Sequence, residues 1–155
     1  MKSILLVDDE ANVCVELQET LQGFGYQVEV AHNFESALSC FGKAHFDAIV
    51  VEFNLRSEDA SQPRTGNGIR LVRQLRAMET TVPILMYTAM EGELYQTNSL
   101  DAGVDEFISK TKSFSSFPSR LQIHVRRHAP QREGGTIRLP TSPSRARARM
   151  VGSIS

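Results

Sequence analysis

The sequence predicts an α/β fold in which a doubly wound, five-stranded parallel sheet is covered by helices on both faces. Short apolar or alternating segments typical of strands recur five times, and each is followed by a segment with the apolar spacing of a helix. Strands that alternate with helices of this length favour parallel pairing, because each helix carries the chain back across the sheet. The 155 residues, 41% of them hydrophobic, are enough for one domain with a substantial core.

The strands are predicted from their apolar content and from the turn residues around them. The first and third are continuous apolar runs, as expected for strands with both faces covered. The second alternates apolar and polar residues, the fourth begins with proline at the position where a strand tolerates it, and the fifth is short. In chain order the predicted strands are 4–7, 26–30, 48–51, 83–87 and 106–108.

The helices are predicted from apolar residues three or four positions apart. We expect the first to be capped by Asp8, Asp9 and Glu10, which would give it an N-cap and an acidic first turn. A glycine lies near the predicted end of the first, second and fourth helices, and a proline lies in the first turn of the last. The predicted helices are 13–24, 34–41, 69–78, 94–102 and 117–128.

The charge distribution separates an acidic body from a basic end. Residues 1–125 carry ten basic and 17 acidic side chains, a balance of −7, whereas residues 126–155 carry seven arginines and one glutamate, a balance of +6. Prolines and glycines gather and apolar periodicity is lost near the end of the chain, so we predict a folded domain over 1–128 and a disordered basic tail over 129–155. The tail has no interleaved aromatics to stack on bases, which argues against nucleic-acid binding.

The sequence also argues against a membrane protein. No apolar run approaches the ~20 residues of a spanning helix, and the first apolar run is too short for a secretory signal. Cys14 and Cys40 lack a CxxC spacing and are expected to be reduced thiols. These features favour a cytoplasmic protein without a membrane partner.

Polar residues stand where the predicted strands end. These residues are Asp8 and Asp9 after the first strand, Glu52 after the third, Thr88 after the fourth and Lys110 after the fifth. The carboxyl ends of parallel strands meet at one edge of a sheet, so we expect these side chains to converge. Three crowded carboxylates need a cation or raised pKa values, and oxygen ligands of this kind suit Mg²⁺ or Mn²⁺.

These segments resemble the receiver domain of bacterial two-component response regulators. The resemblance covers about residues 2–128, and the step of 22 residues from Thr88 to Lys110 is the usual family spacing. It implies a flavodoxin-like (βα)₅ fold with strand order 2-1-3-4-5. The matching motifs are at 4–10, 47–55, 87–89 and 102–110.

The resemblance also implies a role for each site residue. In this family the acids hold Mg²⁺, an aspartate after the third strand accepts a phosphoryl group from a histidine kinase, and a hydroxyl and a lysine contact the phosphoryl oxygens. An aromatic on the fifth strand acts as a switch, although a half-buried strand residue is an equal alternative. By position, the metal ligands are Asp8, Asp9, Glu52 and the backbone of Asn54; Glu52 holds the phosphoacceptor position, Thr88 and Lys110 contact the phosphoryl group, and Phe107 is the switch.

The phosphoacceptor position departs from the family because it carries Glu52 in place of aspartate. The extra methylene displaces the carboxylate by ~1.5 Å, and misplacement of ~1 Å can slow phosphoryl transfer by ~10²-fold. We therefore expect no ordinary aspartyl phosphorylation and a fixed negative charge near Thr88 and Lys110. Because Lys110 is expected to pair with Glu52, Mg²⁺ should bind weakly or not at all.

Two further departures concern loops near the site. The loop after the third strand is about eight residues longer than the family usually has, and residues 57–65 would overhang the site. A tolerated surface insertion is the simpler interpretation, and a lid or a partner-binding loop is the alternative. Thr111 replaces the proline that usually follows the lysine, which is expected to loosen that turn.

The sequence thus favours an atypical receiver, or pseudo-receiver, in a phosphorelay: an interaction module and not an enzyme. Its expected partner is a histidine kinase, a downstream output protein or a second copy of the chain. Alternatives are a receiver still phosphorylated on Glu52 or elsewhere, an unrelated flavodoxin-like binder or dehalogenase-type phosphatase, and a nucleic-acid or acidic-partner binder acting through its arginine-rich tail. The expected interaction face, on the fourth helix, fifth strand and last helix, holds Leu94, Tyr95, Phe107, Ile108, Arg120 and His124.

Overall fold

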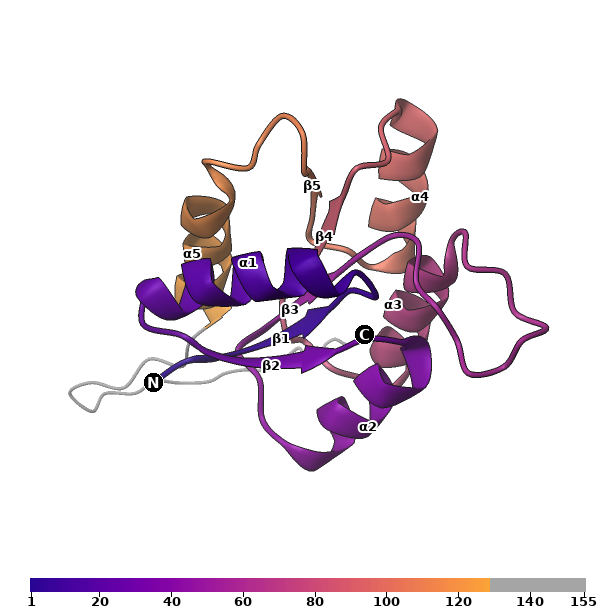
Figure 1. The fold of residues 1–155 in the computed structure, drawn as a ribbon, viewed down its shortest axis with the longest axis horizontal. Helices are drawn as coiled ribbons and strands as arrows, with labels where there is room; N and C mark the ends of the chain where they lie inside the picture. Colours follow the sequence, from indigo (N-terminus) through magenta and orange to yellow (C-terminus); the bar gives the residue numbers. More distant parts are fainter. Residues whose placement is uncertain (129–155) are drawn as a thin grey trace, which may run out of the picture.

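A computed structural model of the chain describes residues 1–128 and confirms the predicted fold (Figure 1). Five parallel strands pair in the order β2-β1-β3-β4-β5, as expected for a flavodoxin-like sheet. The predicted tail at 129–155 lies outside the described residues. The elements are β1 Ser3–Val7, α1 Ala11–Gly23, β2 Gln27–Ala31, α2 Phe34–Lys43, β3 Ala48–Val51, α3 Asn67–Ala77, β4 Ile84–Thr88, α4 Glu93–Ala102, β5 Glu106–Ser109 and α5 Phe117–His128.

The alternating side chains of the strands divide the core into two layers. On one face of the sheet, Leu5 and Val7 pack in a cluster with residues of α2, α3 and α4. On the other face, Ile4 and Leu6 pack with residues of α1 and α5. Both faces of the central strands are therefore buried, which explains why their sequences are continuously apolar.

The strand register sets the ends of β1, β3 and β4 side by side. Val7 is opposite Val51, and Val51 is opposite Met86, so the residues that follow these strands emerge at the same edge of the sheet. The backbone amide of Glu52 donates to the carbonyl of Val7 over 3.0 Å, which fixes the first residue after β3 beside the end of β1.

The N-cap of α1 falls within the predicted segment, but the predicted side-chain cap and acidic first turn are wrong. Helix α1 begins at Ala11 with Glu10 as its N-cap, no side chain caps it, and its first turn contains no acidic residue. The Asp8 carboxylate instead accepts the Glu10 amide over 2.9 Å, and Asp9 bonds to the loop after β3. The two aspartates therefore serve the strand-end site and not the helix terminus.

The start of α3 is packed tightly against the backbone of the strand-end site. A Cβ atom on Gly68 would lie 2.0 Å from the carbonyl oxygen of Glu52, far inside van der Waals contact. Only glycine permits this approach, and the Gly68 amide uses it to donate to the carbonyl of Phe53 over 2.9 Å. The chain after β3 is thereby held to the first turn of α3.

Within the described residues, no helix is both long enough and apolar enough to span a membrane. Cys14 is buried, Cys40 is half-buried, and both are free thiols. The reduced state of the two thiols stays a prediction.

Candidate functional site

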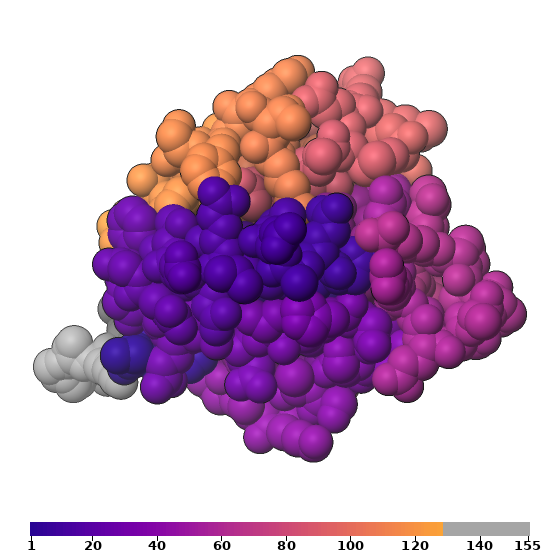
Figure 2. Space-filling view, viewed as in Figure 1, coloured from indigo at the N-terminus to yellow at the C-terminus, as the bar shows by residue number. Residues whose placement is uncertain are grey.

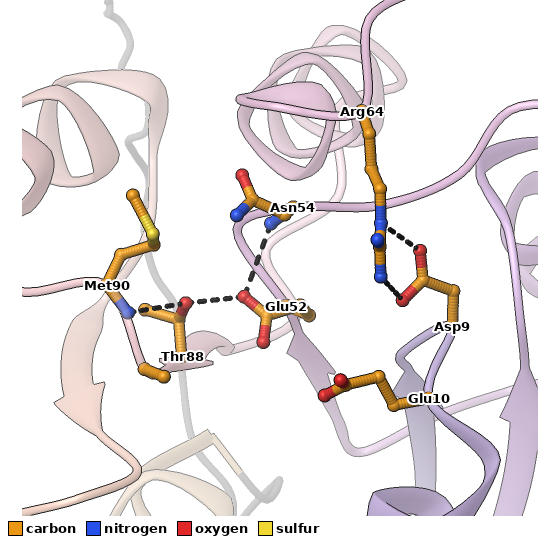
Figure 3. A pocket seen from close by; sticks show the side chains of 8 residues that line it. Asp9, Glu10, Glu52, Asn54, Arg64, Thr88 and Met90 are labelled. Carbon is orange, nitrogen blue, oxygen red and sulfur yellow. Dashed lines mark hydrogen bonds and ion pairs between the residues drawn. The ribbon is translucent and has the colours of Figure 1, made fainter.

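A pocket of about 240 Å³ opens at the carboxyl ends of β1, β3 and β4 (Figure 3). It contains four of the predicted site residues, together with an arginine that we did not predict to belong to the site. Asp8 and Lys110 complete the site through direct contacts with its members. The pocket is lined by Asp9, Glu10, Glu52, Asn54, Arg64, Thr88, Ala89 and Met90.

Glu52 lies at the centre of these contacts and is only 8% exposed. Its Oε2 atom accepts hydrogen bonds from the Thr88 hydroxyl and, over 3.2 Å, from the Asn54 amide. Its Oε1 atom accepts from Lys110 over 2.8 Å. The Met90 amide in turn donates to the Thr88 hydroxyl over 3.2 Å and orients it (Figure 3). The Glu52 carboxylate therefore accepts hydrogen bonds from the Thr88 hydroxyl and the Lys110 ammonium, the two groups that are expected to contact a phosphoryl group.

Lys110 joins Glu52 to Asp8. Its Nζ atom lies 2.9 Å from Oδ2 of Asp8, and both side chains are largely buried. Burial alone would lower the pKa of Lys110, but hydrogen bonds to Asp8 and Glu52 outweigh it and raise the pKa. Burial raises the pKa of Asp8, against the opposing effect of the hydrogen bond from Lys110. Lys110 is therefore a charged group held between two carboxylates.

Asp9 binds Arg64 (Figure 3). The Nε and Nη2 atoms of Arg64 lie 2.8 and 2.7 Å from the two carboxylate oxygens, a bidentate pair. The Asp9 side chain is 1% exposed, and the Arg56 amide also donates to it over 3.0 Å. The hydrogen bond from Arg64 to Asp9 raises the pKa of the arginine further above its usual range.

The loop between β3 and α3 is tied to the domain at several points and forms the right edge of the space-filling view (Figure 2). Besides the pair of Arg64 with Asp9, the Ser57 hydroxyl and the Glu58 amide donate to Glu35 on α2 over 2.6 and 2.7 Å. The simpler interpretation of the sequence was a tolerated surface insertion, which needs no side-chain bonds to the rest of the domain. This loop instead makes such bonds to both Glu35 and Asp9.

A resident Mg²⁺ ion would need free oxygens on Asp8, Asp9 and Glu52. Every carboxylate oxygen of these three residues already accepts a hydrogen bond from a protein group. Over residues 1–128, no group of three or more His, Cys, Asp or Glu side chains is arranged to hold a metal ion. As arranged, these residues do not fit a resident Mg²⁺ ion.

The turn after Lys110 is held by side-chain hydrogen bonds instead of a proline. The Thr111 hydroxyl donates to Glu91 in the loop after β4, and its amide donates to the Ser109 hydroxyl over 3.2 Å. The Lys110 amide donates to the Thr88 carbonyl over 2.8 Å. These bonds fix the backbone of Lys110 beside β4 without the proline that the family usually has.

The expected interaction face is only partly exposed. Ile108 is 1% exposed and belongs to the core, so its assignment to this surface is wrong. Phe107 is half-buried against the opposite core cluster, a position that suits either a switch or an ordinary strand residue. Arg120 and His124 both bond to Glu106. Tyr95 makes an edge-to-face contact with Phe53, with ring centroids 5.2 Å apart, while Leu94 stays exposed.

Comparison with known proteins identifies relatives of the chain. The family described as the response regulator receiver domain matches residues 4–122. The response regulator MprA of Mycobacterium tuberculosis is 33% identical over 128 residues, which are 83% of this chain and 52% of the relative. The chain therefore spans about half the length of the curated relatives that it matches.

Solved structures show the same fold. The receiver domain of the Francisella response regulator 1452 superposes with a TM-score of 0.73 at 21% identity and covers 83% of this chain and 100% of its own. The non-phosphorylated receiver domain of HemR from Leptospira biflexa superposes with a TM-score of 0.69 at 29% identity and covers 81% of this chain and 94% of its own.

Proposed function

The chain belongs to the response regulator receiver domain family, and on that premise we propose that it is an atypical receiver that signals without ordinary aspartyl phosphorylation. Receiver domains of this family serve two-component signal transduction and generally act as signalling modules, not as enzymes. The proposal concerns what this particular domain does at the position where its relatives accept phosphate.

The contacts of Glu52 carry the proposal. Phosphoryl transfer depends on positioning and on cationic and hydrogen-bonding groups that stabilise the charge of the transferred group. Here the Glu52 carboxylate itself takes the Lys110 ammonium at 2.8 Å and the Thr88 hydroxyl. A transferring phosphoryl group would have to displace both contacts, and it would meet a carboxylate whose reach differs from that of aspartate by a methylene group. The glutamate thus resembles a permanent, weaker substitute for the phosphoryl charge.

The domain would act through contacts with another protein. Receiver domains interact with histidine kinases and output domains, and we propose one of these, or a second copy of the chain, as the partner here. The exposed surface of α4, β5 and α5 includes Leu94 and a mixture of polar groups, a composition that suits a contact with another protein. We also propose a cytoplasmic location and weak or no Mg²⁺ binding, since Lys110 takes oxygens of both Asp8 and Glu52.

Phosphorylation by a small-molecule donor tests the proposal. The purified chain, incubated with acetyl phosphate and Mg²⁺, should keep its unmodified intact mass. A Glu52→Gln variant serves as the matched control, and a typical receiver domain serves as the positive control. A phosphoryl adduct on the wild-type chain that disappears in Glu52→Gln would show that Glu52 still accepts phosphate, and an adduct that persists would place the acceptor elsewhere. Either adduct would refute the proposal.

A further inference from the structure

The carboxylate of Asp9 is buried, and the loop after β3 supplies the cation that pairs with it. Among the described residues, Arg64 is the one cationic side chain within hydrogen-bond distance of this carboxylate. Both of its oxygens accept from the Arg64 guanidinium, at 2.7 and 2.8 Å. The Arg64 side chain is 49% exposed, so it covers the Asp9 carboxylate from the solvent side. A buried charge of this kind is costly unless it is paired, and the bidentate geometry provides a strong pair.

The backbone of Arg64 is fixed where the guanidinium can reach Asp9. Its carbonyl accepts the Leu55 amide over 3.0 Å and the Asn67 amide over 3.2 Å. The buried Asn67 side chain also donates to the Leu55 carbonyl over 2.8 Å, which closes the base of the loop. Arg64 is thus presented by a closed loop base and not by a free surface segment, which lowers the entropy lost when the pair forms.

The charges around the pocket show what Arg64 supplies. The buried side chains of Asp8, Asp9 and Glu52 carry three negative charges, and Lys110 supplies one positive charge. The more exposed Arg56 and Glu10, 3.8 Å from Asp9 and 4.0 Å from Lys110, add one charge of each sign and leave this balance unchanged. Without Arg64 the imbalance would be two negative charges, which a divalent cation would match. With Arg64 in place, both oxygens of Asp9 are bonded to a guanidinium and its charge is already paired, so a metal ion would have to compete with Arg64 for it.

We infer that Arg64 serves as the second cation of this site in place of a divalent metal ion, so that metal binding and the pairing of Arg64 with Asp9 exclude each other. This inference rests on the proposed weak binding of Mg²⁺ and names the residue responsible. Because the exclusion is reciprocal, any change that takes Asp9 from Arg64 also removes one tie of the loop of residues 56–66, while the bonds of Ser57 and Glu58 to Glu35 remain. The long loop is then part of the site, and its position depends on whether Asp9 binds Arg64 or a metal ion.

Calorimetric titration with Mg²⁺ tests the exclusion directly. The Arg64→Gln variant should bind Mg²⁺ at least tenfold more tightly than the wild type, and the Asp9→Asn/Arg64→Gln double variant should lose the gain. Arg73→Gln, the same substitution at an exposed position on α3, should bind as the wild type does. Equal affinity of the wild type and Arg64→Gln would overturn the inference and leave the proposed function standing if both bind weakly. Tight binding by the wild type that depends on Asp9 would overturn both.

Tryptic cleavage gives a second measurement that needs neither metal nor a variant at Arg64. Replacement of Asp9 by asparagine should increase the rate of cleavage after Arg64 in the native protein, because the carboxylate no longer holds the Arg64 guanidinium. Asp101→Asn, at an exposed position on α4, is the matched control and should cleave at the wild-type rate. An unchanged rate in Asp9→Asn would show that the pair does not hold the loop and would overturn the inference.

Discussion

Lys110 and Glu52 form a buried ion pair of 2.8 Å across the carboxyl ends of β5 and β3. The two residues are 58 positions apart in the chain, and the sheet order separates their strands by β4. The pair links a position expected to accept a phosphoryl group to the residue expected to contact that group. Its energetics can therefore be measured by changing one partner at a time.

Loss of Lys110 should destabilise the domain more than loss of the negative charge of Glu52. In Lys110→Met the two carboxylates of Asp8 and Glu52 stay buried without a cation, which should lower the free energy of unfolding by about 3–5 kcal/mol. In Glu52→Gln the lysine keeps its bond to Asp8, so the loss should be smaller. Urea unfolding of both variants measures the difference.

The control for this comparison is Lys112→Met. Lys112 is 73% exposed and pairs with Glu91 at 3.6 Å, so its replacement should change the free energy of unfolding by less than about 0.5 kcal/mol. If Lys110→Met proved as mild as this control, the ammonium of Lys110 would not compensate the buried carboxylates in solution.

Two glycines of the helices should respond to alanine with opposite signs. Gly68→Ala should lower the free energy of unfolding by about 3 kcal/mol or more, because the new methyl group meets the carbonyl oxygen of Glu52. Gly42→Ala, in the last turn of α2 with nothing within 4 Å of the new atom, should raise it by about 0.5–1 kcal/mol. Thermal and urea unfolding of the two variants test this, and tolerance of Gly68→Ala would mean that α3 can shift away from β3.

The elements of the fold follow from local patterns in the sequence. Continuous apolar runs predict β1 and β3 because central parallel strands are buried on both faces, and the structure places four fully buried residues in β3. Strand ends are specified by the same patterns, so the convergence of Glu52, Thr88 and Lys110 could be expected from the order of elements alone. The remaining errors in the elements are shifts of a few residues at their ends.

The role of Arg64 could not be predicted in the same way. A loop has no periodicity that fixes its path, and Arg64 reaches Asp9 only through hydrogen bonds between residues 55 positions apart. The sequence did offer a chemical signal for this pair. The long loop after β3 carries two arginines, Arg56 and Arg64, next to a predicted cluster of three carboxylates. The side-chain cap of α1 was wrongly predicted for a related reason, because an aspartate before a helix can either cap it or serve the strand that it follows.

The chain should fold without residues 129–155, whose sequence predicts a separate basic tail. The core on the α5 face is already completed by Phe117, Leu121 and Val125, all within the described domain. A chain that ends at His128 should therefore melt within a few degrees of the full chain. A large decrease in the melting temperature would show that residues 129–155 pack on the domain, and the domain would then extend beyond residue 128.

Cys14 should be unreactive in the native protein at pH 8. Burial and, to a smaller extent, the charge of Asp8 raise the pKa of its thiol to about 11, so only about one molecule in a thousand carries the reactive thiolate. In a Cys40→Ser variant, Ellman's reagent should give no rapid reaction until urea unfolds the chain. In the converse Cys14→Ser variant the half-buried Cys40 should react faster. Rapid modification of Cys14 would show that α1 opens away from the sheet.

Alkaline pH should remove the stabilisation that Lys110 provides. The pKa of Lys110 is raised in the folded chain above its usual value of 10.5, because its bonds to Asp8 and Glu52 outweigh burial. The folded chain thus holds this proton more tightly than the unfolded chain, so the contribution is complete below about pH 10 and is lost as the pH rises through the folded pKa.

The difference in the free energy of unfolding between the wild type and Lys110→Met isolates this contribution. It should be constant from neutral pH to about pH 9 and should shrink above about pH 10.5. Burial also raises the pKa of Tyr87, but this tyrosine is present in both proteins, and its titration largely cancels in the difference. Lys112→Met should show no such trend, because that side chain is exposed. A difference that stayed constant beyond pH 11 would mean that Lys110 stabilises the domain by packing and not by its charge.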